Sequence, residues 1–427
     1  MFGLLRNQLQ AIGRVNWALS DQAMISASNF LTSVIAARMM GIEEFGRFMV
    51  AWMIILLFKD LQSSRLEPTL LSIGPKQSAK DRAEYFGSAV AEQAAFAGAS
   101  FILVVIGMLI AAPFVQELNL AELTLPLAAA VFADEMQDFM RRYFYTVNRP
   151  VSAFVNDFIS YGGRIVVLAF LWWYAPVTSA GTLWVLFALG IIPVVIGLFT
   201  LDPVRINLSR MIPVAVRHWE LSKWTVGTSI LRWMAGNLFI FMGGAILGAQ
   251  TIGAVRAAMN VLAPRNVVIN GLTNIVIVNG STTLHEKGPG ELRRYLMRIG
   301  AFGLAFEASI SIFAIIFAEP IMYYVYGPDF VPYAFLIYWL AAVNLVQFLV
   351  FPFGCGLKIL EYTKPYFVSA IFEAAFGLLA SYFLVTWFGL HGVTIGLVIT
   401  FAIALTVLSR ACLKRLNEYV PAATSSR

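Results

Sequence analysis

The sequence predicts an all-α, polytopic membrane protein with about twelve transmembrane helices in two six-helix lobes. Three observations support this prediction. Of the 427 residues, 59% are hydrophobic and only 13% are charged, whereas soluble globular proteins carry roughly 25% charged residues. Long apolar windows recur along the chain, and its two halves share motifs at nearly constant spacing. No long polar stretch remains between the windows, which excludes a separate catalytic or nucleic-acid-binding domain.

Each apolar window is expected to be a helix, because unpaired backbone groups cannot face lipid. The first window is unusually polar, so it predicts a first span rather than a cleavable signal peptide. The windows of the first half lie near residues 19–40, 46–68, 85–112, 121–146, 150–175 and 181–201. Those of the second half lie near residues 222–247, 253–283, 292–318, 331–357, 364–388 and 391–413.

The distribution of basic residues predicts the orientation, since Lys and Arg collect in cytoplasmic loops. With the N-terminus inside, the inner segments hold 23 of the 30 Lys and Arg residues, and the outer ends hold three. Both termini are therefore expected in the cytoplasm. The remaining four basic residues fall within spans: Lys59, Arg164, Arg232 and Arg265.

An internal repeat underlies the two halves. The first inter-span turn (41–46) and the seventh-to-eighth turn (248–253) both read G-x4-G, 207 residues apart. Two further matches, at offsets of 215 and 211, pair Pro150 with Pro365 and Gly181 with Gly392. Six spans is an even number, so the two repeats keep the same orientation in the membrane. We expect one lobe at residues 1–213 and another at 214–427, facing a central cleft as in a transporter.

Several motifs resemble those of the Wzx-type polysaccharide flippases, in the multidrug/oligosaccharidyl-lipid/polysaccharide exporter superfamily. The similar segments run over nearly the whole chain: the polar first span and its G-x4-G turn, Asp60 in span two, 141–144 before Arg149-Pro150, and 326–330. The glycine that usually follows the span-two acid is missing here, and the motifs indicate fold and broad substrate class rather than a particular glycan.

The resemblance implies a MATE-like, V-shaped transporter of the bacterial cytoplasmic (inner) membrane. Its cargo would be an undecaprenyl-diphosphate-linked oligosaccharide, moved to the outer leaflet for O-antigen, lipopolysaccharide or exopolysaccharide synthesis. The implied partners are this lipid-linked oligosaccharide, membrane lipids, and the glycosyltransferases and polymerase of the same pathway, without nucleic acid. Flippases of the lipid-linked peptidoglycan precursor usually have two further spans.

The charges within spans are the first candidates for substrate binding, because a charge in the bilayer is costly and is usually functional. Lys59 lies about 20 Å inward from Gly46 along its helix, and Arg265 lies about 18 Å inward from Gly253. The repeat thus predicts one cation at similar depth in each lobe, suited to holding a diphosphate. The alternative is that each pairs with a local acid; Asp60 adjoins Lys59.

Polar stripes predict which helices line the cleft. In span seven, Arg232 shares a face with Thr225, Ser229 and Gly236, and in span one Asn29 belongs to a stripe of the same spacing. Such stripes also serve as contacts between helices. Arg164 in span five is a candidate for the same cavity.

Asparagines of span eight are further candidates for the cargo. Asn266, Asn270 and Asn274 recur every four residues after a predicted kink at Pro264. They would bind sugar hydroxyls or join helices, and the sequence does not separate these roles.

The acidic residues predict two different roles. Asp138 is four residues before Arg142, and Asp134 is one turn earlier, so we expect this set to be structural. Glu307 and Glu373 lie well within their spans and are candidates for ion coupling through a proton. The two cysteines make neither a metal cluster nor a disulfide framework, and we expect no metal and no cofactor.

Two other functions compete with the flippase. A membrane-embedded glycan polymerase or glycosyltransferase would need a sizeable outer loop and catalytic groups, which the sequence lacks, so we expect no enzyme. A MATE-like small-molecule antiporter would favour acidic cavity residues for cationic drugs. The four intramembrane cations favour an anionic cargo instead.

Overall fold

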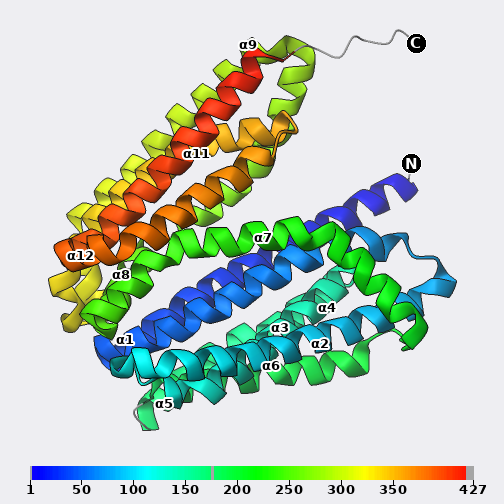
Figure 1. Ribbon diagram of the computed structural model, residues 1–427. Helices are drawn as coiled ribbons and strands as arrows, with labels where there is room; N and C mark the ends of the chain where they lie inside the picture. The colour runs from blue at the N-terminus through cyan, green and yellow to red at the C-terminus, as the bar shows by residue number, and fades with distance from the viewer. Residues whose placement is uncertain (1, 175–176, 420–427) are drawn as a thin grey trace. The chain divides into compact units, whose positions relative to one another are not determined.

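The computed structural model describes residues 2–174 and 177–419, without the side chains of residues 2–15, 18–19, 79–80, 117, 208, 267, 270 and 274. Every regular element in this part of the chain is a helix (Figure 1). The predicted all-α class is confirmed.

The helices follow one another with short connections. The first half contains α1 (Phe2–Ile73), α2 (Ala79–Ala111), α3 (Leu120–Thr146), α4 (Pro150–Asp157), α5 (Gly163–Tyr174), α6 (Ser179–Thr200) and α7 (Leu208–Leu247). Single 3-10 turns are η1 (Gly74–Lys76), η2 (Ala112–Phe114) and η3 (Gln116–Leu118), and a π-helical turn, η4 (Phe158–Gly162), joins α4 to α5. The second half contains α8 (Ala249–Val261), α9 (Arg265–Ile316), α10 (Ala318–Ile321), η5 (Met322–Tyr326), η6 (Pro328–Tyr333), α11 (Phe335–Ile359) and α12 (Lys364–Asn417).

Three of these helices each contain two spans that meet at a glycine. Gly41 in α1, Gly288 in α9 and Gly389 in α12 have φ values of 72°, 80° and 58°, which side chains with a Cβ rarely adopt. We split these helices at the glycines, count α4–η4–α5 as one segment, and join α8 to the first part of α9. The described chain then has twelve helical segments, six in each half, as predicted.

The backbone repeats where the sequence repeats. Gly41 has φ 72° and ψ 173°, and Gly248 has φ 93° and ψ 167°, so both G-x4-G turns begin with nearly the same conformation. Pro150 and Pro365 both lie in the first turn of their helices, where the fixed φ of proline suits the helix start. The predicted kink at Pro264 is also confirmed, since a turn at 262–264 separates α8 from α9.

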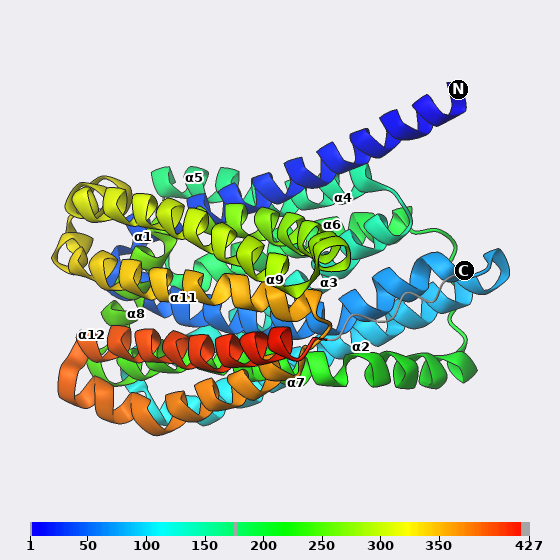
Figure 2. The same cartoon turned by 90° about the horizontal axis from the view of Figure 1, so that it is seen from above.

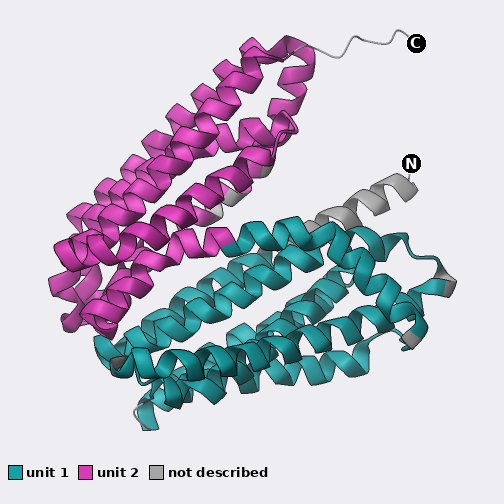
Figure 3. Ribbon diagram, viewed as in Figure 1, with its two compact units in different colours: residues 1–230 teal, residues 231–427 magenta. Residues whose placement is uncertain are grey.

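The chain forms two compact units, unit 1 (Met1–Ile230) and unit 2 (Leu231–Arg427) (Figure 3). The boundary between them lies inside α7, later than the predicted lobe boundary at residues 213 and 214, which stays a prediction. In unit 1, α3 packs against α1, α2, α4 and α6. In unit 2, α11 packs against α8, α9 and α12 (Figure 2). These two central helices are the fourth span of each half, and both carry buried polar residues.

Candidate functional site

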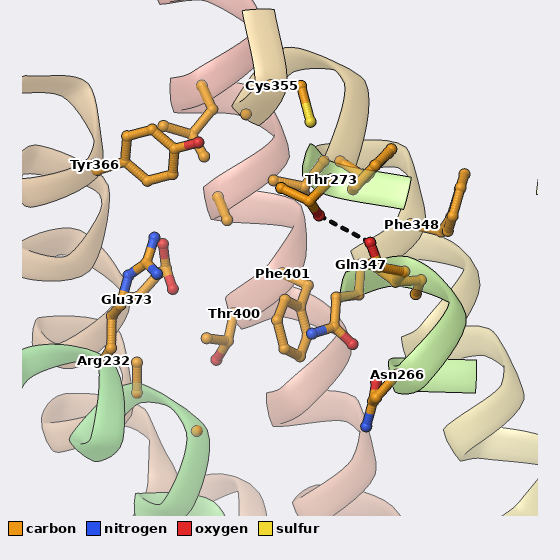
Figure 4. Close-up of a pocket in the computed structure, with 18 of the residues that line it drawn as sticks. Arg232, Asn266, Thr273, Gln347, Phe348, Cys355, Tyr366, Glu373, Thr400 and Phe401 are labelled. Carbon is orange, nitrogen blue, oxygen red and sulfur yellow. Dashed lines mark hydrogen bonds between the residues drawn. The ribbon is translucent and has the colours of Figure 1, made fainter. Parts of the chain in front are cut away.

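Unit 2 contains a pocket of about 390 Å³ between α7, α9, α11 and α12 (Figure 4). Aromatic side chains of α11 and α12 form part of its wall. The charged groups that line it are three cations and one carboxylate, so the pocket lining is positively charged. The polar residues of the lining include Arg232, Arg265, Asn266, Thr273, Gln347, Lys358, Tyr366, Glu373 and Thr400.

Arg265 connects the pocket to a buried acid. Its Nη1 lies 3.5 Å from Glu307 Oε2, and its Nη2 donates a hydrogen bond to Gln347 Oε1. The Arg265 side chain is 5% exposed and that of Glu307 is fully buried. The reversal of α9 at Gly288 explains the pair, because Arg265 precedes it by 23 residues and Glu307 follows it by 19. A predicted substrate residue and a predicted coupling residue are therefore ion-pair partners.

Arg232 lies on another wall of the same pocket. Its guanidinium is 5.2 Å from the centre of the Tyr366 ring, a cation–π contact. The Glu373 carboxylate lies beside Arg232 in Figure 4, and Glu373 Oε1 accepts a hydrogen bond from Ser369 Oγ. Arg232 and Glu373 thus both reach the pocket that Arg265 lines.

The polar stripe of α7 has two different roles along its length. Thr225 donates to the Ser64 carbonyl over 2.9 Å, and the Ser229 and Ser64 hydroxyls lie 2.5 Å apart. These residues join α7 to α1, which is the helix-contact role. Arg232 and Gly236 instead line the pocket, so one stripe contributes both to packing and to the cavity.

In unit 1, Lys59 and Arg164 share one acid. Lys59 Nζ lies 3.2 Å from Asp134 Oδ2, and Arg164 Nη2 lies 3.4 Å from Asp134 Oδ1. Tyr161 lies between them: Lys59 Nζ donates to its hydroxyl over 2.9 Å, and the Arg164 guanidinium is 4.5 Å from its ring centre. Lys59 thus has a local partner, although it is Asp134 rather than the neighbouring Asp60. Arg164 is only 2% exposed, so its charge is compensated by Asp134 in the interior of unit 1.

A second set of buried acids surrounds Arg141 and Arg142. Arg142 Nε lies 2.6 Å from Asp138 Oδ2, as the spacing of four residues predicts. Arg141 lies 2.8 Å from Asp157 and 3.2 Å from Asp21. These contacts join α3 to α1 and α4 in a structural network. Asp134, which the sequence grouped with Asp138, makes its ion pairs with Lys59 and Arg164 instead.

The predicted asparagines lie in different settings. Asn29 is half-buried on α1, and Asn266 lines the pocket. The side chains of Asn270 and Asn274 lie outside the described residues. The sugar contacts predicted for Asn29 and Asn270 stay predictions.

Sequence reasoning missed a buried polar cluster in unit 1. His218 on α7 lies between Glu92, 2.6 Å from its Nδ1, and Tyr85, whose hydroxyl is 3.2 Å from its Nε2. Arg65 lies 2.6 Å from Glu92 as well. The sequence signal that could have revealed it is the pair of adjacent polar residues, Glu92 and Gln93, inside the apolar window of span three. Among the described residues, no group of three or more His, Cys, Asp or Glu side chains is placed to hold a metal ion.

Comparisons with known proteins agree on a transporter fold. The model of a family described as polysaccharide biosynthesis protein matches residues 35–334. None of the curated proteins matches the chain. A multidrug resistance MATE family transporter of the MOP superfamily, solved facing inward, is 14% identical, with a TM-score of 0.76 over 92% of this chain and 95% of that one.

Two other solved structures share this fold. The lipid II flippase MurJ, in an inward closed conformation, is 14% identical, with a TM-score of 0.72 over 95% of this chain and 89% of that one. A MOP superfamily transporter from Pyrococcus furiosus, described as having a binding pocket of reverse polarity, is 14% identical, with a TM-score of 0.63 over 93% of both chains. At this identity the similarity shows the fold alone, which is that of MOP superfamily transporters.

Proposed function

Because the chain belongs to the polysaccharide biosynthesis protein family, with the fold of MOP superfamily transporters, we propose that it flips an undecaprenyl-diphosphate-linked oligosaccharide across the bacterial cytoplasmic membrane. The cargo would move from the inner to the outer leaflet for surface polysaccharide synthesis, such as O-antigen, lipopolysaccharide or exopolysaccharide. Transport changes the leaflet of the cargo and not its covalent structure, so we propose no enzymatic step.

The observation that carries this proposal is the cationic pocket of unit 2. A diphosphate is the part of such a lipid that most resists entering the membrane, and Arg groups bind phosphate oxygens through parallel hydrogen bonds. Arg265 and Arg232 belong to two different walls of the pocket. We assign them to the diphosphate.

The other predicted substrate residues take a lesser place in the proposal. Lys59 and Arg164 share Asp134 in unit 1, and neither belongs to the lining of the unit 2 pocket. Asn29 and Asn270 are proposed contacts for sugar hydroxyls. Glu373 is a candidate for ion coupling alongside Glu307. The proposed partners are membrane lipids and the glycosyltransferases and polymerase of the pathway, with both termini of the chain in the cytoplasm.

Complementation of a strain that lacks the transporter tests the proposal. Arg265→Gln combined with Glu307→Gln, so that no buried acid is left without its counter-ion, should abolish surface polysaccharide while the amount of protein in the membrane stays near normal. Arg265→Lys should keep part of the export because a point charge remains. Arg294→Gln is the matched control, since Arg294 lies on the same helix, is exposed and pairs with Glu291 at the surface. Normal export by an Arg265→Gln, Lys59→Gln double variant would eliminate the diphosphate role of both residues.

The MATE-like fold supports a second candidate, an antiporter of small molecules. This function predicts that expression of the chain lowers the drug sensitivity of a pump-deficient strain and that loss of the chain leaves surface polysaccharide intact. The positive lining of the pocket favours the anionic lipid over a cationic drug.

A further inference from the structure

Glu307 is held in an unusual way for a buried acid. Its side chain is fully buried, and neither of its carboxylate oxygens has a hydrogen-bond partner in the described structure. Ser311, one turn further along α9, has a buried hydroxyl that also lacks a partner. The compensation that Glu307 receives is the ion pair with Arg265 at 3.5 Å.

A buried carboxylate without hydrogen bonds depends on its counter-ion. Removing one partner of a buried ion pair is strongly unfavourable, because the remaining charge stays desolvated. A carboxylate avoids this cost by binding a proton. The protonation of Glu307 is therefore tied to the charge that Arg265 offers it.

The same guanidinium serves the pocket. Arg265 lines the cavity and binds Gln347 through Nη2, so an anion in the pocket lies in the field of Arg265. If the anion displaces Glu307, the carboxylate loses its counter-ion. If the ion pair remains, the added negative charge still opposes the negative charge of Glu307. In both arrangements Arg265 no longer fully compensates the negative charge of Glu307.

We propose that Glu307 binds a proton from solution when an anionic headgroup enters the pocket, and releases it when the headgroup leaves. This inference rests on the proposed function, since it takes the anion to be the diphosphate of the cargo. The step converts the Glu307 carboxylate to a carboxylic acid and breaks no other bond. The proton offsets one unit of the negative charge that the cargo brings into the membrane interior.

Among the described residues, Glu307 has one ion pair, the one with Arg265. Arg265 is within ion-pair distance, and α11, which packs against α9, brings the uncharged Gln347 to the same guanidinium. The other titratable groups that line the pocket are Arg232 on α7, Cys355 and Lys358 on α11, and Tyr366 and Glu373 on α12.

Calorimetry of the purified full-length protein tests the proposal with methanedisulfonate as the probe. This anion has the two tetrahedral groups of a diphosphate and no proton of its own to exchange near neutral pH. Binding heats in buffers of different ionisation enthalpy give the number of protons taken up. We expect up to about one proton per bound anion in the wild type, and by reciprocity an affinity that falls by up to about tenfold per unit rise in pH.

Three variants locate the proton. Glu307→Gln should bind the anion without proton uptake and with little dependence on pH. Glu291→Gln, an exposed acid on the same helix, should behave like the wild type. Glu373→Gln should keep the proton uptake; uptake that disappears in this variant and persists in Glu307→Gln would overturn the proposal.

The outcomes separate this inference from the function on which it rests. Anion binding by the wild type without proton uptake would overturn the inference and leave the proposed cargo site standing. An absence of anion binding, or binding that Arg265→Gln leaves unchanged, would overturn the cargo site and the proton link with it.

Discussion

Replacing Asp134 by Asn should destabilise unit 1 strongly. Asp134 lies on the central helix α3 and is the acid that Lys59 and Arg164 share. Asparagine keeps the size of the side chain and removes its charge. Two cations would then lie near one another without their common counter-ion, and Arg164 is almost completely shielded from water.

The magnitude follows from the distances. At 3.2 Å for Lys59 and 3.4 Å for Arg164, each attraction is worth about 5 kcal/mol at an effective dielectric constant of about 20. Mutual repulsion of the two cations and the hydrogen bonds that Asn can still accept reduce the net loss to about 3 kcal/mol or more, the range for breaking a buried pair. Such a loss should lower the melting temperature by at least about 6 °C for a unit of this size.

Thermal unfolding of the purified variants in detergent measures this loss. Asp134→Asn combined with Arg164→Met removes the most buried unpaired charge and should recover more than half of the loss. Glu220→Gln is the control within unit 1, because its exposed pair with Lys223 should contribute at most about 1 kcal/mol. A melting temperature for Asp134→Asn equal to that of Glu220→Gln would refute the argument that Asp134 compensates buried charge.

Two further predictions concern topology and backbone. Reporter fusions at Arg210 and Thr178 should report opposite sides of the membrane, and signals from the same side would contradict the twelve-span arrangement. Gly248→Ala should cost about 1–3 kcal/mol, since φ 93° with ψ 167° lies in a region open essentially to glycine alone. Gly98→Ala, in a helix with open space beside it, should keep the wild-type melting temperature or raise it, and an equally stable Gly248→Ala variant would show that the turn carries no strain.

The features that the sequence predicted well are local ones. Apolar windows determine helices because the hydropathy of about 20 residues decides whether a segment enters lipid. The turns at Gly41 and Gly248 were predictable because glycine adopts a positive φ more readily than other residues.

The partners of the charges were not predictable in the same way. Lys59 pairs with an acid 75 residues away in the sequence. The adjacent Asp60 does not pair with it, because consecutive residues lie on different faces of a helix. The polar stripe lies on one face of α7, yet Ser229 contacts Ser64 of α1 while Arg232 lines the pocket. Spacing within one helix gives the face and does not give the neighbour that covers it.

The π turn at 158–162 limits which insertions and deletions this protein can accept during evolution. A π turn holds one residue more than an α turn, and each residue of a helix rotates its successors by about 100°. Deleting one residue there would leave a regular helix of almost unchanged hydropathy and would turn Arg164 away from Asp134. Loops tolerate single insertions and deletions, whereas here the residue count itself is expected to be under selection. Descendants of this sequence should vary in composition at this turn more readily than in length.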